Sequence, residues 1–293
     1  MQHALTVQQL SLSRTPQAQH WHDATLTWKK VSVLKDISFE LPQGAVMGLV
    51  GRNGAGKSSL MRCLVGLTPP DSGHSQLLGC DSLQLSDSVR ERLGYVAQTP
   101  DLLDGLSGHD HLSLMQQAYP GFDLNYALRL GVRLDLPLDR QAQHLSLGDQ
   151  QKLSVLLALA HQPELLILDE PVASLDPLSR RNFMRELFNH PAQDLPRSVL
   201  ISSHLLADLE RVVTHVCFLR EGRVQLVDEW DALLEHLRLV VTPEAWATEG
   251  VVCQRRCGTL QHTVVDLRQC PHTALPTSGQ PLTMDDLFEE LNA

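Results

Sequence analysis

The sequence predicts an α/β fold with a mainly parallel core sheet, and two segments carry this prediction. In the first, an apolar stretch at 46–50 leads into a glycine-rich loop and then a helical pattern, within GAVMGLVGRNGAGKSSLMRCLVG. In the second, the apolar stretch 165–168 ends in Asp169 and Glu170. Repeated strand–loop–helix units place parallel strands side by side, so that their carboxyl ends meet at one edge of the sheet.

The composition is that of an ordinary globular protein. Of 293 residues, 43% are apolar and 20% charged, which allows one large domain or a large domain with a small one. The formal net charge of −10 argues against a general nucleic-acid binder, which usually presents a basic face. The start MQHALTVQQL lacks the features of a secretory signal, and no run approaches the ~18–20 apolar residues that cross a bilayer. We therefore expect another chain to hold this one at any membrane.

The stretch from Gly51 to Ser58 fits the phosphate-loop pattern. Glycines let backbone N–H groups turn toward phosphate oxygens, and the positive end of the following helix faces the same anion. Lys57 adds a charge for the β- and γ-phosphates, and the Ser58 hydroxyl can bind Mg²⁺. The alternative is a chance glycine-rich turn, which the strand before it and the helix after it disfavour. The predicted nucleotide-binding residues are Asn53, Gly54, Ala55, Gly56, Lys57, Ser58 and Ser59.

The helix after this loop is expected to bury one apolar face and to be stopped by two prolines. The expected face contains Leu60, Leu64 and Leu67, and the prolines are Pro69 and Pro70.

Asp169 and Glu170 supply the acidic groups that phosphoryl chemistry needs. An acidic residue at a strand end can hold Mg²⁺, directly or through water. A second carboxylate beside it can act as general base toward the attacking water. A strand that simply ends in a solvated acidic turn is the alternative, and the phosphate loop weakens it.

Together, these motifs resemble the ATPase subunit of an ABC (ATP-binding cassette) transporter over roughly residues 25–235. The matching segments are GRNGAGKSS, YVAQTP, LSLGDQ, LLILDE, ASLDP and LISSH, in the order that the family has them. Alone, Gln98, Asp176 or His204 could be an ordinary surface, turn or strand-end residue. Their order and separation make the set specific.

The resemblance implies a role for each matching residue. Gln98 positions Mg²⁺ and links the γ-phosphate to the membrane partner, Glu170 activates water, and His204 contacts the γ-phosphate. The implied metal ligands are Ser58, Gln98 and Asp169. The implied contacts to nucleotide held by a second subunit are Ser146, Leu147, Gly148, Asp149 and Asp176.

An aromatic ring that stacks on adenine is also implied. Trp28 lies six residues before Leu34, where the family places this ring, and stacking on a base is worth about 1–3 kcal/mol. A tryptophan buried in a strand is the alternative. Because TPQAQHWHDA separates the first expected strand from Trp28, Trp21 or His22 could instead be the ring that contacts the base.

The segment LSLGDQQK is also a good helix start, because Ser146 followed by Asp149 resembles a helix N-cap with an acidic third residue. The helix that follows is expected to place Leu153, Leu156, Leu157 and Ala160 on one face. The segment departs from the family at two positions. Leu147 replaces the first of two glycines, and Asp149 stands where glutamine is usual. Because a carboxylate near a phosphate is repelled, we expect weaker ATP-driven dimerisation.

The resemblance also implies the domain organisation. An antiparallel β section near the N-terminus includes LTWKKVSVLKDISFEL and HSQLLGCD, and a helical subdomain spans about 100–160. Residues 1–235 form the predicted ABC ATPase domain, and residues 236–293 form a small α+β extension. In the extension, RLVVTPEAW, VVCQRR and HTVVDL are predicted strands, and MDDLFEELNA is a predicted helix. The extension either aids dimerisation or regulation, or it only shields the core.

The function that the resemblance implies is ATP binding and hydrolysis in an exporter-type ABC transporter. ATP and Mg²⁺ are the expected cofactors. Two subunits, either two copies or this chain with a homologous cassette, would close around two ATP molecules and drive a separate membrane permease. The expected location is the cytoplasmic side of the cell membrane, held there by the permease, with no nucleic acid bound. Two alternatives stay open: a soluble ABC-type ATPase in translation or DNA maintenance, and a regulatory subunit that binds ATP but scarcely turns it over.

Overall fold

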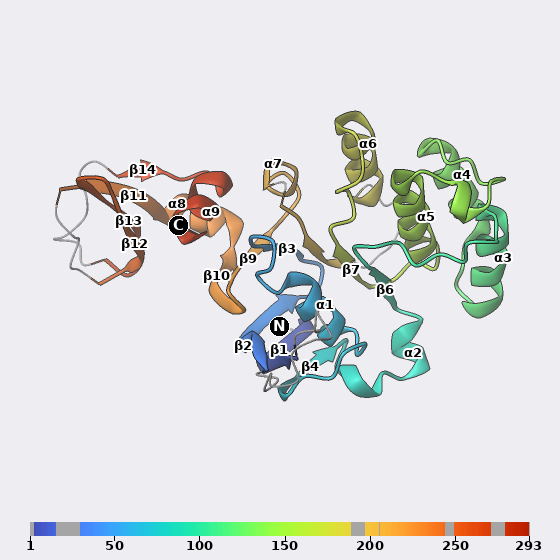
Figure 1. Cartoon of the computed structure of the whole chain (residues 1–293), viewed down its shortest axis with the longest axis horizontal. Helices are drawn as coiled ribbons and strands as arrows, with labels where there is room; N and C mark the ends of the chain where they lie inside the picture. The colour runs from blue at the N-terminus through green and yellow to red at the C-terminus, as the bar shows by residue number, and fades with distance from the viewer. Residues whose placement is uncertain are drawn as a thin grey trace, which may run out of the picture.

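The computed structural model describes residues 3–15, 30–188, 197–204, 206–243, 249–270 and 279–292. Trp28, Trp21 and His22, the candidates for stacking on adenine, lie outside these ranges. The described residues form three sheets, with most of the helices gathered at one end of the molecule and a small α+β unit at the other (Figure 1).

The central sheet has six strands in the order β10-β9-β3-β8-β7-β6. The strands from β9 to β6 pair in parallel, whereas β10 pairs antiparallel with β9. This confirms the α/β class with a mainly parallel core. Because β3, β8 and β7 are neighbours, the segments that follow them meet at one edge of the sheet. The strands are β3 (Val46–Val50), β6 (Leu93–Val96), β7 (Leu165–Asp169), β8 (Ser198–Ser202), β9 (His215–Arg220) and β10 (Arg223–Glu229).

The N-terminal sheet is antiparallel, as predicted, in the order β2-β1-β4-β5. Helix α1 (Lys57–Leu64) packs between this sheet and the central one, because Leu60 and Leu64 share a buried cluster with Leu5 of β1 and Leu165 of β7. The phosphate loop therefore rests on apolar side chains from both sheets. The strands are β1 (His3–Arg14), β2 (Val31–Pro42), β4 (Ser72–Leu77) and β5 (Cys80–Asp81).

Helix α1 ends earlier than the sequence predicted. The left-handed Gly66 (φ 75°) terminates it, and the amides of Gly66 and Leu67 donate to the carbonyls of Cys63 and Arg62, at 3.0 and 2.9 Å. This is the glycine-terminated hydrogen-bond pattern common at helix ends. The prediction that Leu67 belongs to the buried face is wrong, since Leu67 is 59% exposed and the prolines lie beyond a helix that has already ended.

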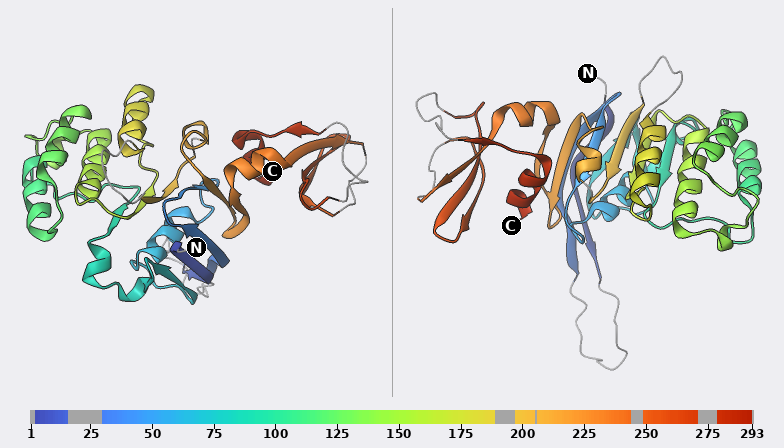
Figure 2. Two further views of the ribbon diagram at one scale, coloured as in Figure 1. Left: turned by 180° about the vertical axis from the view of Figure 1, so that it is seen from behind. Right: turned by 90° about the horizontal axis from the view of Figure 1, so that it is seen from above.

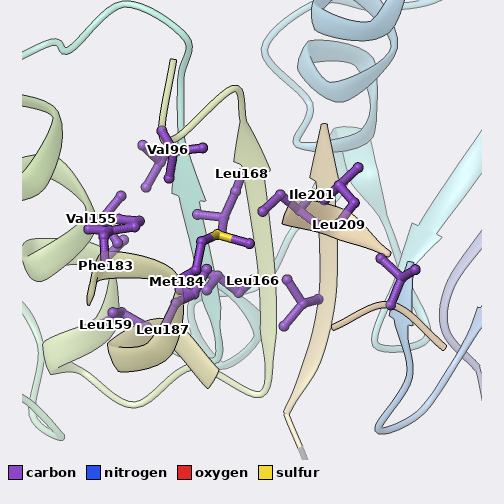
Figure 3. Close-up of a cluster of buried hydrophobic side chains, with 14 of the residues drawn as sticks. Val96, Val155, Leu159, Leu166, Leu168, Phe183, Met184, Leu187, Ile201 and Leu209 are labelled. Carbon is purple, nitrogen blue, oxygen red and sulfur yellow. The ribbon is translucent and has the colours of Figure 1, made fainter. Parts of the chain in front are cut away.

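The helices between β6 and β7 form a layer at one end of the central sheet (Figure 1). Figure 3 shows Leu166 and Leu168 of β7 beside Val155 and Leu159 of α5 and Phe183 of α6, all members of one buried cluster. This packing fixes the start of α5 relative to the sheet. The helices and turns from Ser82 to Leu209 are η1 (Ser82–Gln84), α2 (Asp87–Arg90), α3 (Gly108–Ala118), α4 (Leu124–Arg133), η2 (Ala142–His144), α5 (Leu147–Ala160), α6 (Pro177–Phe188) and α7 (Leu206–Leu209).

The C-terminal unit is an antiparallel sheet in the order β12-β13-β11-β14 with two helices (Figure 2). The predicted strands and the final helix are present. Helix α8 spans the expected boundary at 235/236, so no loop separates the two parts there. The elements are α8 (Trp230–His236), β11 (Leu237–Thr242), β12 (Val251–Cys257), β13 (Leu260–Asp266), β14 (Gln280–Pro281) and α9 (Met284–Asn292).

Helix α9 ties this unit to the central sheet. Met284, Leu287 and Leu291 lie in the same buried cluster as Leu206 and Leu209 of α7. The Arg220 guanidinium of β9 donates to the Leu291 carbonyl at 3.1 Å.

On the other side of α9, the buried Glu290 accepts two hydrogen bonds from Arg255, at 2.6 and 2.8 Å, and lies 2.9 Å from His262 Nδ1. Burial raises the pKa of the Glu290 carboxyl, but these hydrogen bonds outweigh it, so that the pKa is lowered overall.

Candidate nucleotide-binding site

The phosphate loop joins β3 to α1 at the carboxyl edge of the central sheet. Gly54 and Gly56 have φ angles of 82° and 109°, in the region that favours glycine. At Gly56, a Cβ atom would also lie 2.9 Å from Leu34 Cδ2. Glycine is therefore required at residue 56 both by conformation and by close approach.

Lys57 lies under this loop, with its side chain only 7% exposed. Its ammonium donates to the Gly51 carbonyl at 2.8 Å and lies 3.6 Å from Glu170 Oε1. The loop thus encloses a cationic group beneath backbone amides, which is the arrangement that binds phosphates.

Glu170 directly follows β7 and is 5% exposed. Its φ angle is 49°, a left-handed conformation that is uncommon for a residue with a side chain. One carboxylate oxygen faces Lys57, and the other lies 2.7 Å from His204 Nδ1. The structure therefore brings together Lys57, Glu170 and His204, which lie far apart in the sequence.

Asp169 ends β7 and is 1% exposed. Its Oδ1 accepts a hydrogen bond from the Ser202 hydroxyl at 2.7 Å, and the same hydroxyl accepts the Glu170 amide at 2.9 Å. Sequence reasoning missed Ser202. No local motif points to Ser202. It becomes recognisable only from strand pairing, because β7 and β8 are neighbours and Asp169 and Ser202 are register partners.

The predicted metal ligands lie along one edge of the site. The Ser58 hydroxyl donates to Gln98 Oε1 at 3.4 Å, and both residues line a cavity of about 390 Å³ together with Lys57 and Glu170. Asn53, Gly54, Gly56 and Ser59 also line it. Hydroxyl, amide and carboxylate oxygens suit Mg²⁺, which is usually bound by one or two carboxylates and substrate phosphates. The residues present therefore fit the expected ion.

A second, larger cavity of about 660 Å³ begins at the same residues. Ser58, Gln98 and Asp169 line it, together with Tyr119 and His161. The rings of Tyr119 and His161 stack with centroids 4.5 Å apart. Gln98 therefore borders both cavities.

The start of α5 is built as a helix cap, as predicted. The Ser146 hydroxyl accepts the Asp149 amide at 3.1 Å and donates to Asp149 Oδ2 at 2.7 Å. The other oxygen of Asp149 lies 3.3 Å from Lys152 Nζ. Leu147 is 56% exposed. None of Ser146, Leu147, Gly148 and Asp149 is among the described residues that line the cavity at the phosphate loop.

Asp176 caps the start of α6 by accepting hydrogen bonds from backbone amides. Its carboxylate accepts the amides of Leu178 and Ser179, at 3.0 and 3.1 Å. Hydrogen bonds from Ser179, followed by those from backbone amides, hold the pKa of the Asp176 carboxyl below its usual value.

Comparison with known proteins identifies the family. The ABC transporter family model matches residues 34–173. The chain is 30% identical over 203 residues to the ABC transporter ATP-binding protein YtrB of Bacillus subtilis (strain 168), covering 69% of each. It is 33% identical to the ABC-type transporter ATP-binding protein EcsA of the same organism, over 76% of this chain and 95% of that protein. The chain belongs to the ABC transporter ATP-binding proteins, and it is an ATPase of that family.

One further relative and a solved structure point to the same family. The bacitracin transport ATP-binding protein BcrA of Bacillus licheniformis is 32% identical, over 69% of this chain and 66% of its own length. A solved ATP-binding subunit of an ABC transporter superposes with a TM-score of 0.64 and 28% identity, over 79% of this chain and 92% of that one.

Among the described residues, no helix is both long and apolar enough to span a bilayer.

Proposed function

We propose that this chain binds and hydrolyses Mg²⁺–ATP to drive a separate membrane permease, with two subunits closing around two nucleotides. The observation that carries this proposal is the contact of Glu170 with both Lys57 and His204 at the edge of the phosphate-loop cavity. A carboxylate held between a phosphate-binding lysine and a histidine is placed to activate the water that attacks the terminal phosphate.

In this proposal, Lys57 and the loop amides bind the phosphates, and Glu170 accepts a proton from the attacking water. His204 orients Glu170 and contacts the γ-phosphate. Bound Mg²⁺ would neutralise charge on the β- and γ-phosphates. Ser58, Gln98 and Asp169 would hold it.

The start of α5 completes the site of a second subunit. Its free amides and the helix dipole favour an anion, and Ser146, Leu147, Gly148 and Asp149 are the residues that would contact the opposite nucleotide. Asp176 would lie across the same interface.

A permease segment would dock in the larger cavity, where Gln98 connects it to the metal ligands. The location that follows is the cytoplasmic face of the cell membrane. Export is the proposed direction, because the relatives include a protein named for Nod factor export, which is 31% identical over 74% of this chain. Another relative is named for phosphonate import, so transport assays with the permease are the test of direction.

We assign residues 1–235 to the ATPase domain and 236–293 to an extension. The contacts of α9 with α7 and with Arg220 favour a role for the extension in supporting the core.

The test is mild detergent extraction of the tagged protein from its native cells, followed by identification of stoichiometric partners. A multi-span membrane protein is the expected partner, and transport assays with it would give direction and substrate. Recovery of only soluble protein or RNA would contradict the proposed function.

A further inference from the structure

Ser202 ends β8 with its side chain fully buried, at 0% exposure. Its hydroxyl can donate one proton and accept others, and in this structure it does both. It donates to Asp169 Oδ1 at 2.7 Å and accepts the amide of Glu170 at 2.9 Å. One side chain thus holds two successive acidic residues.

Both hydrogen bonds stabilise groups that need them: a buried amide that requires an acceptor, and a carboxylate whose orientation would otherwise be free. The Glu170 amide is buried at a left-handed residue, where the strand ladder has ended, and a buried amide without an acceptor is unfavourable. The Asp169 carboxylate has rotational freedom about its side chain, and the bond to Oδ1 selects one orientation.

We propose that Ser202 is a positioning residue for ATP hydrolysis. It orients the Asp169 carboxylate toward the metal and holds Glu170 in the conformation that directs its carboxylate between Lys57 and His204. This inference rests on the proposed roles of Asp169 and Glu170.

The position of Ser202 in the chain strengthens the inference. His204 lies two residues further on and contacts Glu170 from the other side. The end of β8 and the residues after it therefore contact Glu170 at two points. Ser202 bonds to its amide, and His204 bonds to its carboxylate. Loss of the Ser202 hydroxyl would remove the contact at the amide.

The test compares three variants of the whole chain. Ser202→Ala removes both hydrogen bonds, and Ser202→Thr keeps the hydroxyl. Ser198→Ala is the matched control, because Ser198 lies at the other end of β8, is 2% exposed and accepts the Gly44 amide at 2.8 Å. It removes a comparable buried bond to a backbone amide away from the site.

For Ser202→Ala, we expect kcat to fall about 10–100-fold, the range seen when partners of metal ligands are removed, with ATP affinity within about twofold. Mn²⁺ binding to the ATP complex, measured by electron paramagnetic resonance, should weaken about tenfold. Ser202→Thr should recover most of both quantities, and Ser198→Ala should leave both close to the parent chain.

Equal kcat and Mn²⁺ affinity in Ser202→Ala and Ser198→Ala would overturn the inference. Measuring Glu170→Gln in parallel separates this failure from failure of the proposed function. If Glu170→Gln loses hydrolysis while Ser202→Ala keeps it, the role of Ser202 is wrong and the assigned base stands. If Glu170→Gln hydrolyses normally, the assigned base is wrong.

Discussion

The phosphate loop and the start of α5 both open a helix, but different side chains surround them. At the phosphate loop, Glu170 contacts both Lys57 and His204, and Lys57 and Glu170 are buried. At the start of α5, Ser146 and Asp149 satisfy each other, and Leu147 faces outward.

This contrast indicates how the proposed chemistry is divided between two subunits. In the proposed function, the charged groups that bind phosphate and activate water come from one subunit, whose fold determines their geometry. The α5 surface is an ordered helix end, and in the proposed function it contacts the nucleotide held by a second subunit. Substitutions at both surfaces test this division.

Glu170→Gln is expected to have the largest effect, because an amide keeps the shape of the side chain but cannot serve as a base. General bases contribute ~10²–10⁴-fold, so we expect kcat to fall by about 100-fold or more, with ATP affinity within about twofold. Steady-state turnover and equilibrium ATP binding measure the two quantities. An ATP-bound dimer should accumulate in size-exclusion chromatography. Unchanged hydrolysis would show that another group is the base.

Leu147→Glu tests the outward surface. A glutamate in the first turn of α5 favours the helix dipole, so the fold is retained, but it adds a negative charge where the partner's phosphates would lie. We expect a fall in turnover of about tenfold. Circular dichroism confirms the fold, and Leu83→Glu, at a leucine of η1 that is 51% exposed and lies outside both surfaces, is the comparison. Normal turnover in Leu147→Glu would show that the start of α5 is not part of the ATP site.

Mixing two defective chains tests the division between subunits. Lys57→Ala lacks the phosphate-binding cation, and Leu147→Glu lacks a compatible α5 surface. In an equal mixture, about half of the dimers are mixed and each has one intact site, so about a quarter of parental turnover should return. No recovery, with mixed dimers demonstrated by differently tagged chains, would mean that each site is completed within one chain.

Asp149→Asn is expected to have the smallest effect. Asparagine can still accept the Ser146 hydroxyl, but one negative charge is removed from the α5 surface. We expect the ATP concentration for half-maximal dimerisation to fall about threefold, as for one partly screened charge. Asp87→Asn is the control, since Asp87 on α2 is 90% exposed and outside both surfaces. An equal response in the two variants would exclude a local effect of Asp149.

Local motifs made the central sheet, the phosphate loop and the cap at Ser146 predictable. In each case, a few adjacent residues determine the backbone, as glycines do at Gly54 and Gly56. The early end of α1 was not predicted, because Pro69 and Pro70 suggest a later stop. The signal lies in Gly66, whose left-handed conformation ends the helix before the prolines.

Contacts between distant segments were harder to predict. Ser202 lies 33 residues from Asp169, and its role needs the register of β7 and β8. Arg220 and Leu291 are 71 residues apart, and their contact needs the path of α9. Pattern reasoning found the strands and helices of the C-terminal unit but could not show which part of the core they cover.

The contact of Arg220 with α9 has a consequence for synthesis of the chain on the ribosome. When β9 has been made, 71 more residues must be added before Leu291 exists. At roughly 5–20 residues per second, the apolar surface of α7 therefore stays exposed for several seconds until α9 has been made and can pack on it. A nascent chain arrested before α9 should be cleaved by protease near α7 more readily than the full chain, and equal resistance of the two would show that the core closes without this helix.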